Sequence, residues 1–242
     1  MTDRAQGAQR RLKLAYNARL PPNSRRFPWP ERASLIAAQD GLYQVLFADI
    51  KGVEASEEYD RSFLKHLVAR SENAISEASD EDEAAVGVSR QDWTVNEDIL
   101  ERYVDLVSLP ATNTPAAEGC LVGAPVPPAI YLRHYFPLQN GPIDPLLGPS
   151  GSVVVREEGV AISQGTTGLK TWEASYRLAA HLVQEQNHWR SDHDRILELG
   201  SGAGLLGMLC AQLVQNTRAQ LYLTDLEGNV MDRLHETASL SK

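Results

Sequence analysis

Residues 196–204 constrain the fold of this chain more than any other segment. They read ILELGSGAG, an apolar run with one acid followed by glycines at alternate positions, and an apolar stretch continues beyond them. This order predicts a strand, a tight turn and a helix. Glycine lets the backbone turn sharply and approach a ligand closely because it has no Cβ. The free N–H groups of the helix N-terminus then face polar or anionic atoms.

The glycine spacing separates two classes of ligand. The dinucleotide fingerprint G-x-G-x-x-G/A, counted from Gly200, would require glycine or alanine at Leu205, so that pattern is broken. The acid at Glu198 followed by Gly200, Gly202 and Gly204 instead resembles the S-adenosylmethionine signature of class I methyltransferases. The pattern therefore favours S-adenosyl-L-methionine over a dinucleotide.

A second acid follows the next expected strand. Residues 221–225 read LYLTD, so Asp225 stands 25 residues after Gly200. Nucleotide-binding folds place a carboxylate at about this spacing, where it accepts hydrogen bonds from ribose hydroxyls. The alternative is that Asp225 only caps the helix that follows it.

The second half of the sequence predicts an α/β layer. We expect a hairpin of residues 153–155 and 160–162, strands at 195–199 and 219–224, and helices at 169–184, 203–213 and 229–240. Alternating strands and helices indicate a parallel sheet covered by helices. The fold class predicted is thus the N-terminal half of a Rossmann-like domain, residues 151–242, preceded by a mainly helical region, residues 1–150.

The first 150 residues predict helices with irregular joints. Prolines make residues 11–30 an extended lead-in, and apolar spacing predicts helices at 34–50, at 57–70 and from Asn96 onward. Residues 71–85 are rich in acids, serine and alanine and lack aromatics, so we expect a disordered acidic linker there. Residues 111–150 predict irregular structure, broken by an aromatic patch at 131–136.

Composition limits the other classes of function. The formal net charge of −9 argues against direct binding of nucleic acid. The two cysteines cannot form a framework of disulfides, and His188 and His193 lack further ligands, so no metal site is expected. No signal-peptide core or stretch of about 18 apolar residues occurs, which predicts a cytoplasmic protein without membrane segments.

Two segments together resemble one family. Residues 166–174 read TTGLKTWEA and residues 197–205 read LELGSGAGL. This pair is similar to the eukaryotic elongation factor 2 lysine methyltransferase family, within the seven-β-strand protein-lysine methyltransferases. The resemblance covers residues 151–213 strongly and the region before 150 loosely. It implies that S-adenosyl-L-methionine binds beside Trp172, along Gly200, Ser201 and Gly202, with its ribose at Asp225. Trp172 could otherwise be an ordinary core aromatic.

The resemblance also implies a reaction and a partner. The expected reaction transfers a methyl group to a lysine of a protein substrate, elongation factor 2, by an enzyme that acts as a monomer. In such enzymes the substrate-side groups follow later strands, which these 242 residues do not contain, so no catalytic residue is named and we expect this chain alone to be inactive or poorly soluble. Two alternatives stay open: a methyltransferase of the same group acting on another protein, and a non-catalytic cofactor-binding protein.

Overall fold

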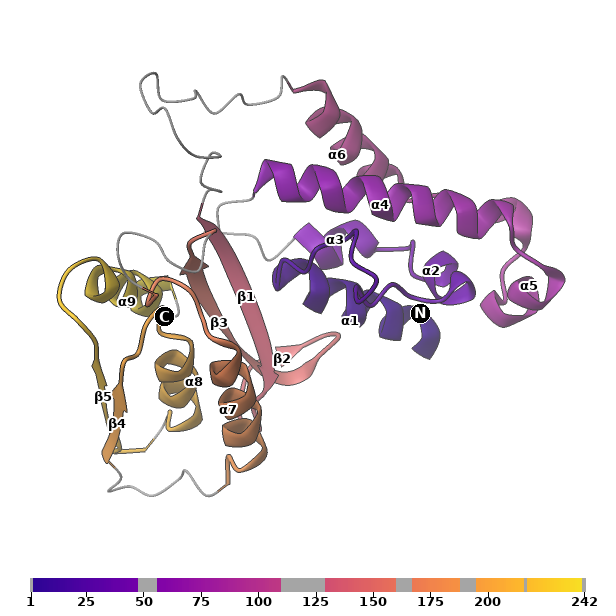
Figure 1. Cartoon of the computed structure of the whole chain (residues 1–242). Helices are drawn as coiled ribbons and strands as arrows, with labels where there is room; N and C mark the ends of the chain where they lie inside the picture. The colour runs from indigo at the N-terminus through magenta and orange to yellow at the C-terminus, as the bar shows by residue number, and fades with distance from the viewer. Residues whose placement is uncertain are drawn as a thin grey trace, which may run out of the picture. The chain divides into compact units, whose positions relative to one another are not determined.

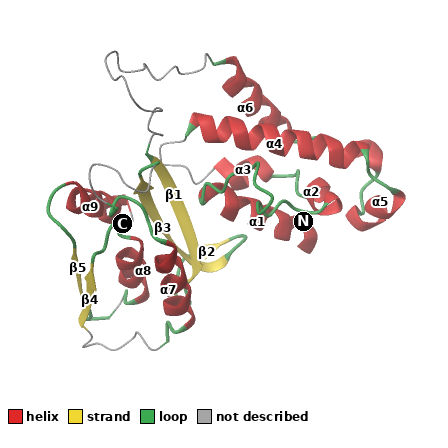
Figure 2. Ribbon diagram, viewed as in Figure 1, coloured by secondary structure: helices red, strands yellow, loops and turns green. Residues whose placement is uncertain are grey.

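The chain forms two compact units, Met1–Pro115 and Ala116–Lys242. The computed structural model describes residues 2–47, 56–109, 129–159, 167–187, 195–215 and 217–240 (Figure 1). Figure 2 shows that all strands belong to the second unit and that the described part of the first is helical. The predicted boundary at residue 150 differs from this division, because it falls within a strand of the second unit.

The first unit is a helical bundle. Its elements are α1 (Asp3–Asn17), α2 (Arg32–Ala37), α3 (Leu42–Phe47), α4 (Glu57–Ser76), α5 (Asp80–Val86), the 3-10 turn η1 (Arg90–Asp92) and α6 (Glu97–Ser108). Leu12 and Tyr16 of α1 share one buried cluster with Phe63 and Leu67 of α4 and Ile99 of α6. The helices predicted at 57–70 and from Asn96 are confirmed, and Asn96 caps α6 by accepting a hydrogen bond from the N–H of Ile99.

Three expectations for this unit were wrong. The lead-in at 11–30 is helical as far as Asn17, because α1 buries an alanine- and leucine-bearing face. The single helix at 34–50 is two short helices, divided where Gly41 adopts a left-handed φ of 71°. Residues 71–85 are largely helical: α4 continues to Ser76, and a capping box of Ser79 and Asp82 starts α5.

The second unit combines an antiparallel and a parallel sheet. Strands β1 (Ile130–Pro137), β2 (Ile143–Asp144) and β3 (Gly148–Glu157) form an antiparallel sheet in the order β1-β3-β2. Strands β4 (Arg195–Leu199) and β5 (Gln220–Thr224) are parallel, and Leu197 pairs with Tyr222. The helices are α7 (Glu173–Gln184), α8 (Leu205–Leu213) and α9 (Asn229–Leu240). A mixed α/β, Rossmann-like arrangement is therefore confirmed.

Helix α8 is the centre of this unit. It packs on β3 through one side and on β5 through another, so it lies between the antiparallel sheet and the parallel pair (Figure 1). Leu205, Leu209 and Leu213 of α8 share a buried cluster with Val153 and Val155 of β3. The opposite face of the parallel pair is open in the described residues: Leu197, Leu199 and Tyr222 are 60%, 76% and 50% exposed.

Residues 153–155 of the predicted hairpin form part of strand β3. Strand β3 pairs with β1, so the aromatic patch at 131–136 is a strand rather than irregular chain, and Leu132 lies opposite Val155. Phe136 of this patch is buried in the core of the second unit. The other expected strand, at 160–162, lies outside the described residues.

A buried charge stabilises the helical unit. The carboxylate of Asp60 accepts hydrogen bonds from the hydroxyl of Tyr16 at 2.7 Å and from the guanidinium of Arg19 at 2.9 Å. Both charged side chains are almost fully buried. Burial, with the charge of Asp60, raises the pKa of Tyr16, which keeps that hydroxyl protonated as a donor.

Asp60→Ala should destabilise the protein by roughly 3–5 kcal/mol, because Arg19 and Tyr16 would stay buried without their acceptor. Denaturant unfolding followed by circular dichroism measures this change. Arg177→Ala, which breaks an exposed pair with Glu173, should cost less than about 1 kcal/mol. Equal costs for the two variants would contradict a stabilising role for the buried cluster.

Candidate functional site

The predicted turn after β4 is present, and backbone hydrogen bonds fix it to β5. The N–H groups of Gly200 and Ser201 both donate to the carbonyl oxygen of Thr224 at 2.9 Å. Gly200, Gly202 and Gly204 all have positive φ, at 71°, 54° and 91°. Side chains at these three positions would strain the backbone, so the alternating glycines of the sequence have a conformational cause.

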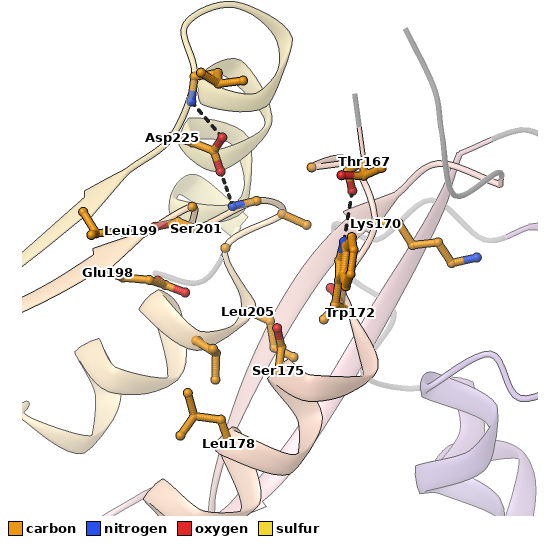
Figure 3. A pocket seen from close by; sticks show the side chains of 18 of the residues that line it. Thr167, Lys170, Trp172, Ser175, Leu178, Glu198, Leu199, Ser201, Leu205 and Asp225 are labelled. Carbon is orange, nitrogen blue, oxygen red and sulfur yellow. Dashed lines mark hydrogen bonds between the residues drawn. The ribbon is translucent and has the colours of Figure 1, made fainter. Parts of the chain in front are cut away.

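Asp225 is held against this glycine turn. Its Oδ2 accepts a hydrogen bond from the N–H of Gly202, and its Oδ1 accepts one from the N–H of Leu226, both at 2.7 Å (Figure 3). Helix α9 begins only at Asn229, and these contacts are not those of an N-cap. Helix capping therefore does not explain Asp225, whereas its lone pairs beyond these two bonds stay available to a ligand.

Trp172 faces the glycine turn from another element. It immediately precedes α7, its side chain is 62% exposed, and its Nε1 donates to the carbonyl oxygen of Thr167 at 3.4 Å. Figure 3 shows the indole on one side of a space with Asp225 and Ser201 on the other. Trp172 is therefore not the core aromatic that its helical spacing would allow.

These walls enclose a cavity of about 590 Å³. All the predicted cofactor-binding residues line it: Trp172, Gly200, Ser201, Gly202 and Asp225. Sequence reasoning missed its remaining wall, which is made by Thr167, Lys170 and Thr171 before α7 and by Ser175 and Leu178 within it. One sequence signal could have identified that wall: Trp172, Ser175 and Leu178 are spaced three residues apart, and such positions share a helix face.

The charged groups of the cavity are unevenly placed. Its charged lining side chains are Glu198, Asp225 and Lys170, and Lys170 extends away from the two acids (Figure 3). Burial raises the pKa of Glu198, and the charge of Asp225 adds to the rise while the nearby Ser201 hydroxyl opposes it. The wall on the glycine side is thus acidic, which favours a ligand that carries hydroxyl or cationic groups.

Two polar atoms of this wall lack hydrogen-bond partners among the described residues. They are Oε2 of Glu198 and Oγ of Ser201, and both are buried. A Cβ at Gly207 would stand 3.0 Å from that Glu198 oxygen, so the carboxylate lies close against the first turn of α8. Buried polar groups are nearly always hydrogen-bonded, so unpaired atoms here are typical of a binding site.

Helix α9 supports the glycine turn from outside the cavity. The fully buried Thr237 donates from Oγ1 to the carbonyl oxygen of Ala203 at 2.7 Å. A Cβ at Gly204 would lie 2.8 Å from a methyl of Leu234 and 3.3 Å from a methyl of Thr237, so a larger residue here would require these α9 side chains to move. The turn is therefore fixed by β5 on one side and by α9 on another.

Metal and membrane features are absent from the described ranges. They contain no group of three or more His, Cys, Asp or Glu side chains that could hold a metal ion. His188 and His193 lie outside the described residues. Among the helices that the structure describes, none combines the length and apolar character needed to cross a bilayer.

The residues of this site lie in a segment that is similar to known proteins. Residues 154–241 match the lysine methyltransferase family. The protein-lysine N-methyltransferase EFM3 of Chaetomium thermophilum is 30% identical over 87% of this chain and 54% of its own length. The protein-lysine N-methyltransferase EEF2KMT is 36% identical in Homo sapiens, over 40% of this chain and 28% of its own length. The Mus musculus protein of that name is 44% identical, over 34% and 26%.

The matches cover only part of each relative's length. The chain spans about half of the EFM3 protein and about a quarter of the two mammalian proteins. The matched region of the family includes the glycine turn, Trp172 and Asp225. The chain is thus similar to protein-lysine methyltransferases in the region that forms the cavity.

Gly204→Ala should destabilise the protein more than Gly228→Ala. Both glycines have φ of 91°, but a Cβ at Gly228 meets nothing within 4 Å. Each variant should lose about 1–2 kcal/mol from the left-handed backbone, and Gly204→Ala about 1–3 kcal/mol more from overpacking against Leu234. Thermal unfolding measures the difference. Equal losses would mean that α9 does not restrict the turn.

Glu198→Gln should stabilise the protein at neutral pH and lose this advantage in acid. The folded-state pKa of Glu198 lies above its ordinary value of 4.5. Protonated Glu198 therefore favours the folded state. This contribution to stability is fully present below pH 4.5 and is lost as the pH rises through the folded-state pKa. Melting temperatures of both proteins at a series of pH values test this. A difference that does not vary with pH would show that burial does not penalise the carboxylate.

Proposed function

We propose that this chain is part of an S-adenosyl-L-methionine-dependent protein-lysine N-methyltransferase, and that its cofactor binds in the cavity between Trp172 and the glycine turn. The observation that carries the proposal is the meeting of the turn, Asp225 and Trp172 around one cavity within the region that matches the lysine methyltransferase family. A volume of about 590 Å³ lies within the range of small-molecule sites.

The residues of the cavity suit this cofactor. Asp225 can accept hydrogen bonds from the two ribose hydroxyls, and such bonds to an ionised acceptor are strong. A Cβ at Gly200 would meet nothing within 4 Å, so the turn leaves space for a ligand to approach the backbone. The buried hydroxyl of Ser201 can donate to or accept from polar atoms of the cofactor.

S-adenosyl-L-methionine would supply an activated methyl group, bonded to a positively charged sulfur, for transfer to a lysine nitrogen. The residues of this chain would bind and orient that group. The acidic wall of Glu198 and Asp225 favours a cationic ligand, and the exposed face of Trp172 offers a surface on which a cation can pack. Holding the reacting atoms in line accounts for much of the acceleration in such transfers.

The substrate that we propose is elongation factor 2. The resemblance of residues 151–213 implies it, and similarity to the mammalian proteins named EEF2KMT supports it. We further propose that the protein acts as a cytoplasmic monomer on protein substrates and that residues 151–242 carry the cofactor. To test the substrate, the native protein is added, with labelled cofactor, to a lysate from cells that lack it. Label in elongation factor 2 is expected, and label in another protein alone would replace that assignment.

Asp225→Asn should weaken binding of S-adenosylhomocysteine by at least about tenfold, since bonds to a charged acceptor contribute about 1.5–3 kcal/mol. Titration calorimetry on the full chain measures the dissociation constant. Asp232→Asn, on the exposed side of α9, is the matched control and should bind as the unchanged protein does. Binding that is insensitive to Asp225→Asn would remove this carboxylate from the proposed site. Binding without methyl transfer by the native protein would favour a non-catalytic cofactor-binding role.

A further inference from the structure

Two adjacent carboxylates stand at the end of β3, outside the cavity. Glu157 is the last residue of the strand and is 4% exposed, and Glu158 follows it with a side chain 12% exposed. Successive side chains of an extended strand point to opposite sides. A buried carboxylate costs free energy unless its hydrogen bonds are made, so the partners of these two acids identify what they hold.

Glu157 holds the wall that carries Trp172. Its Oε1 accepts hydrogen bonds from the backbone N–H of Thr171 at 3.1 Å and from the hydroxyl of Tyr176 at 3.4 Å. The residue after the strand extends this contact, because the N–H of Glu158 donates to the carbonyl oxygen of Leu169 at 2.9 Å. The backbone on both sides of Lys170 is therefore tied to the end of β3, immediately before the indole of Trp172.

Glu158 holds the opposite wall through α9. Its Oε1 accepts a hydrogen bond from Nη2 of Arg233 at 2.7 Å, and Arg233 is itself 7% exposed. Thr237 lies one helical turn beyond Arg233, on the same face of α9, and donates to the carbonyl oxygen of Ala203 in the glycine turn. A continuous series of contacts therefore runs from Glu158 through α9 to the turn.

We infer that Glu157 and Glu158 are positioning residues that fix the two walls of the cavity relative to each other. Neither lines the cavity, and neither touches the cofactor that we propose for it. Because the two glutamates are consecutive, peptide geometry fixes the distance between their backbones. Each carboxylate is bonded to one wall, so the two walls are held at a fixed distance from each other. The inference rests on the proposed function only in taking the cavity as the cofactor site.

The first test compares Glu157→Leu with Glu157→Gln. Leucine removes the acceptor and should raise the dissociation constant for S-adenosylhomocysteine about tenfold, while the amide of Thr171 exchanges hydrogen faster in the absence of ligand. Glutamine keeps an acceptor oxygen and should restore affinity to within about threefold. Glu173→Gln is the matched control: it removes a charge directly after Trp172, and its exposed side chain pairs with Arg177 and does not line the cavity.

The second test acts on the other wall without changing either glutamate. Thr237→Val keeps the side-chain shape and removes only the hydrogen bond to Ala203, so it should weaken binding about fivefold and speed exchange of the Gly202 amide. This variant decides the matter if Glu157→Leu does not fold. Wild-type affinity in folded Thr237→Val, or in folded Glu157→Leu, would overturn the inference.

The two proposals fail in different ways. If the unchanged chain does not bind S-adenosylhomocysteine, the assigned cofactor is wrong, and the amide exchange of Thr171 and Gly202 still tests the positioning role without a ligand. If the unchanged chain binds the cofactor, but the Thr171 amide in Glu157→Leu and the Gly202 amide in Thr237→Val exchange at the rates of the unchanged protein, the positioning role is wrong and the cofactor site stands.

Discussion

The carbonyl group of Thr224 is the acceptor on which the site depends. It takes hydrogen bonds from two consecutive N–H groups, those of Gly200 and Ser201, and so joins the turn after β4 to the end of β5. Asp225 follows directly and binds the next free N–H, that of Gly202. Because parallel strands end at the same edge, two segments of separate sequence become one surface there. Helix α8 begins directly after this surface, and it packs against β3 in the core of the second unit.

The sequence predicted the parallel part of the fold well because its signals there are local. The strand at 195–199 and the helix at 229–240 have the expected bounds. For the strand, the apolar run that ends directly before Gly200 marks where it stops. Strand β1 was missed because its own residues do not alternate cleanly between apolar and polar. Helix α5 was missed because four consecutive acids favour disorder, whereas the chain supplies a capping box and the guanidinium of Arg32 bonded to Asp82 and to the carbonyl of Glu77.

The same distinction applies to the cavity. Gly200, Ser201, Gly202 and Asp225 could be assigned because they occupy fixed places after strands, where topology alone brings them together. Trp172 needed the family resemblance, since helical periodicity also fits a core residue. Lys170 and Leu178 depend on how α7 approaches the turn, and that approach is set by contacts such as Glu157 with Thr171, whose partners are not visible as a pattern in the sequence.

Asp225 is held by two N–H donors before any ligand arrives. A side chain that is already fixed loses little rotamer entropy when it binds, so more of its interaction with a sugar remains as affinity. In the proposed site, the same fixed negative charge would discriminate among nucleotides. An unmodified ribose offers donors to a carboxylate, whereas a sugar bearing a phosphate at the 2′ position brings a second anion to a place with no cation beside it, since Lys170 points elsewhere. At the cofactor site that we propose, the carboxylate would favour adenosine-type ligands over phosphorylated coenzymes by repulsion as much as by attraction.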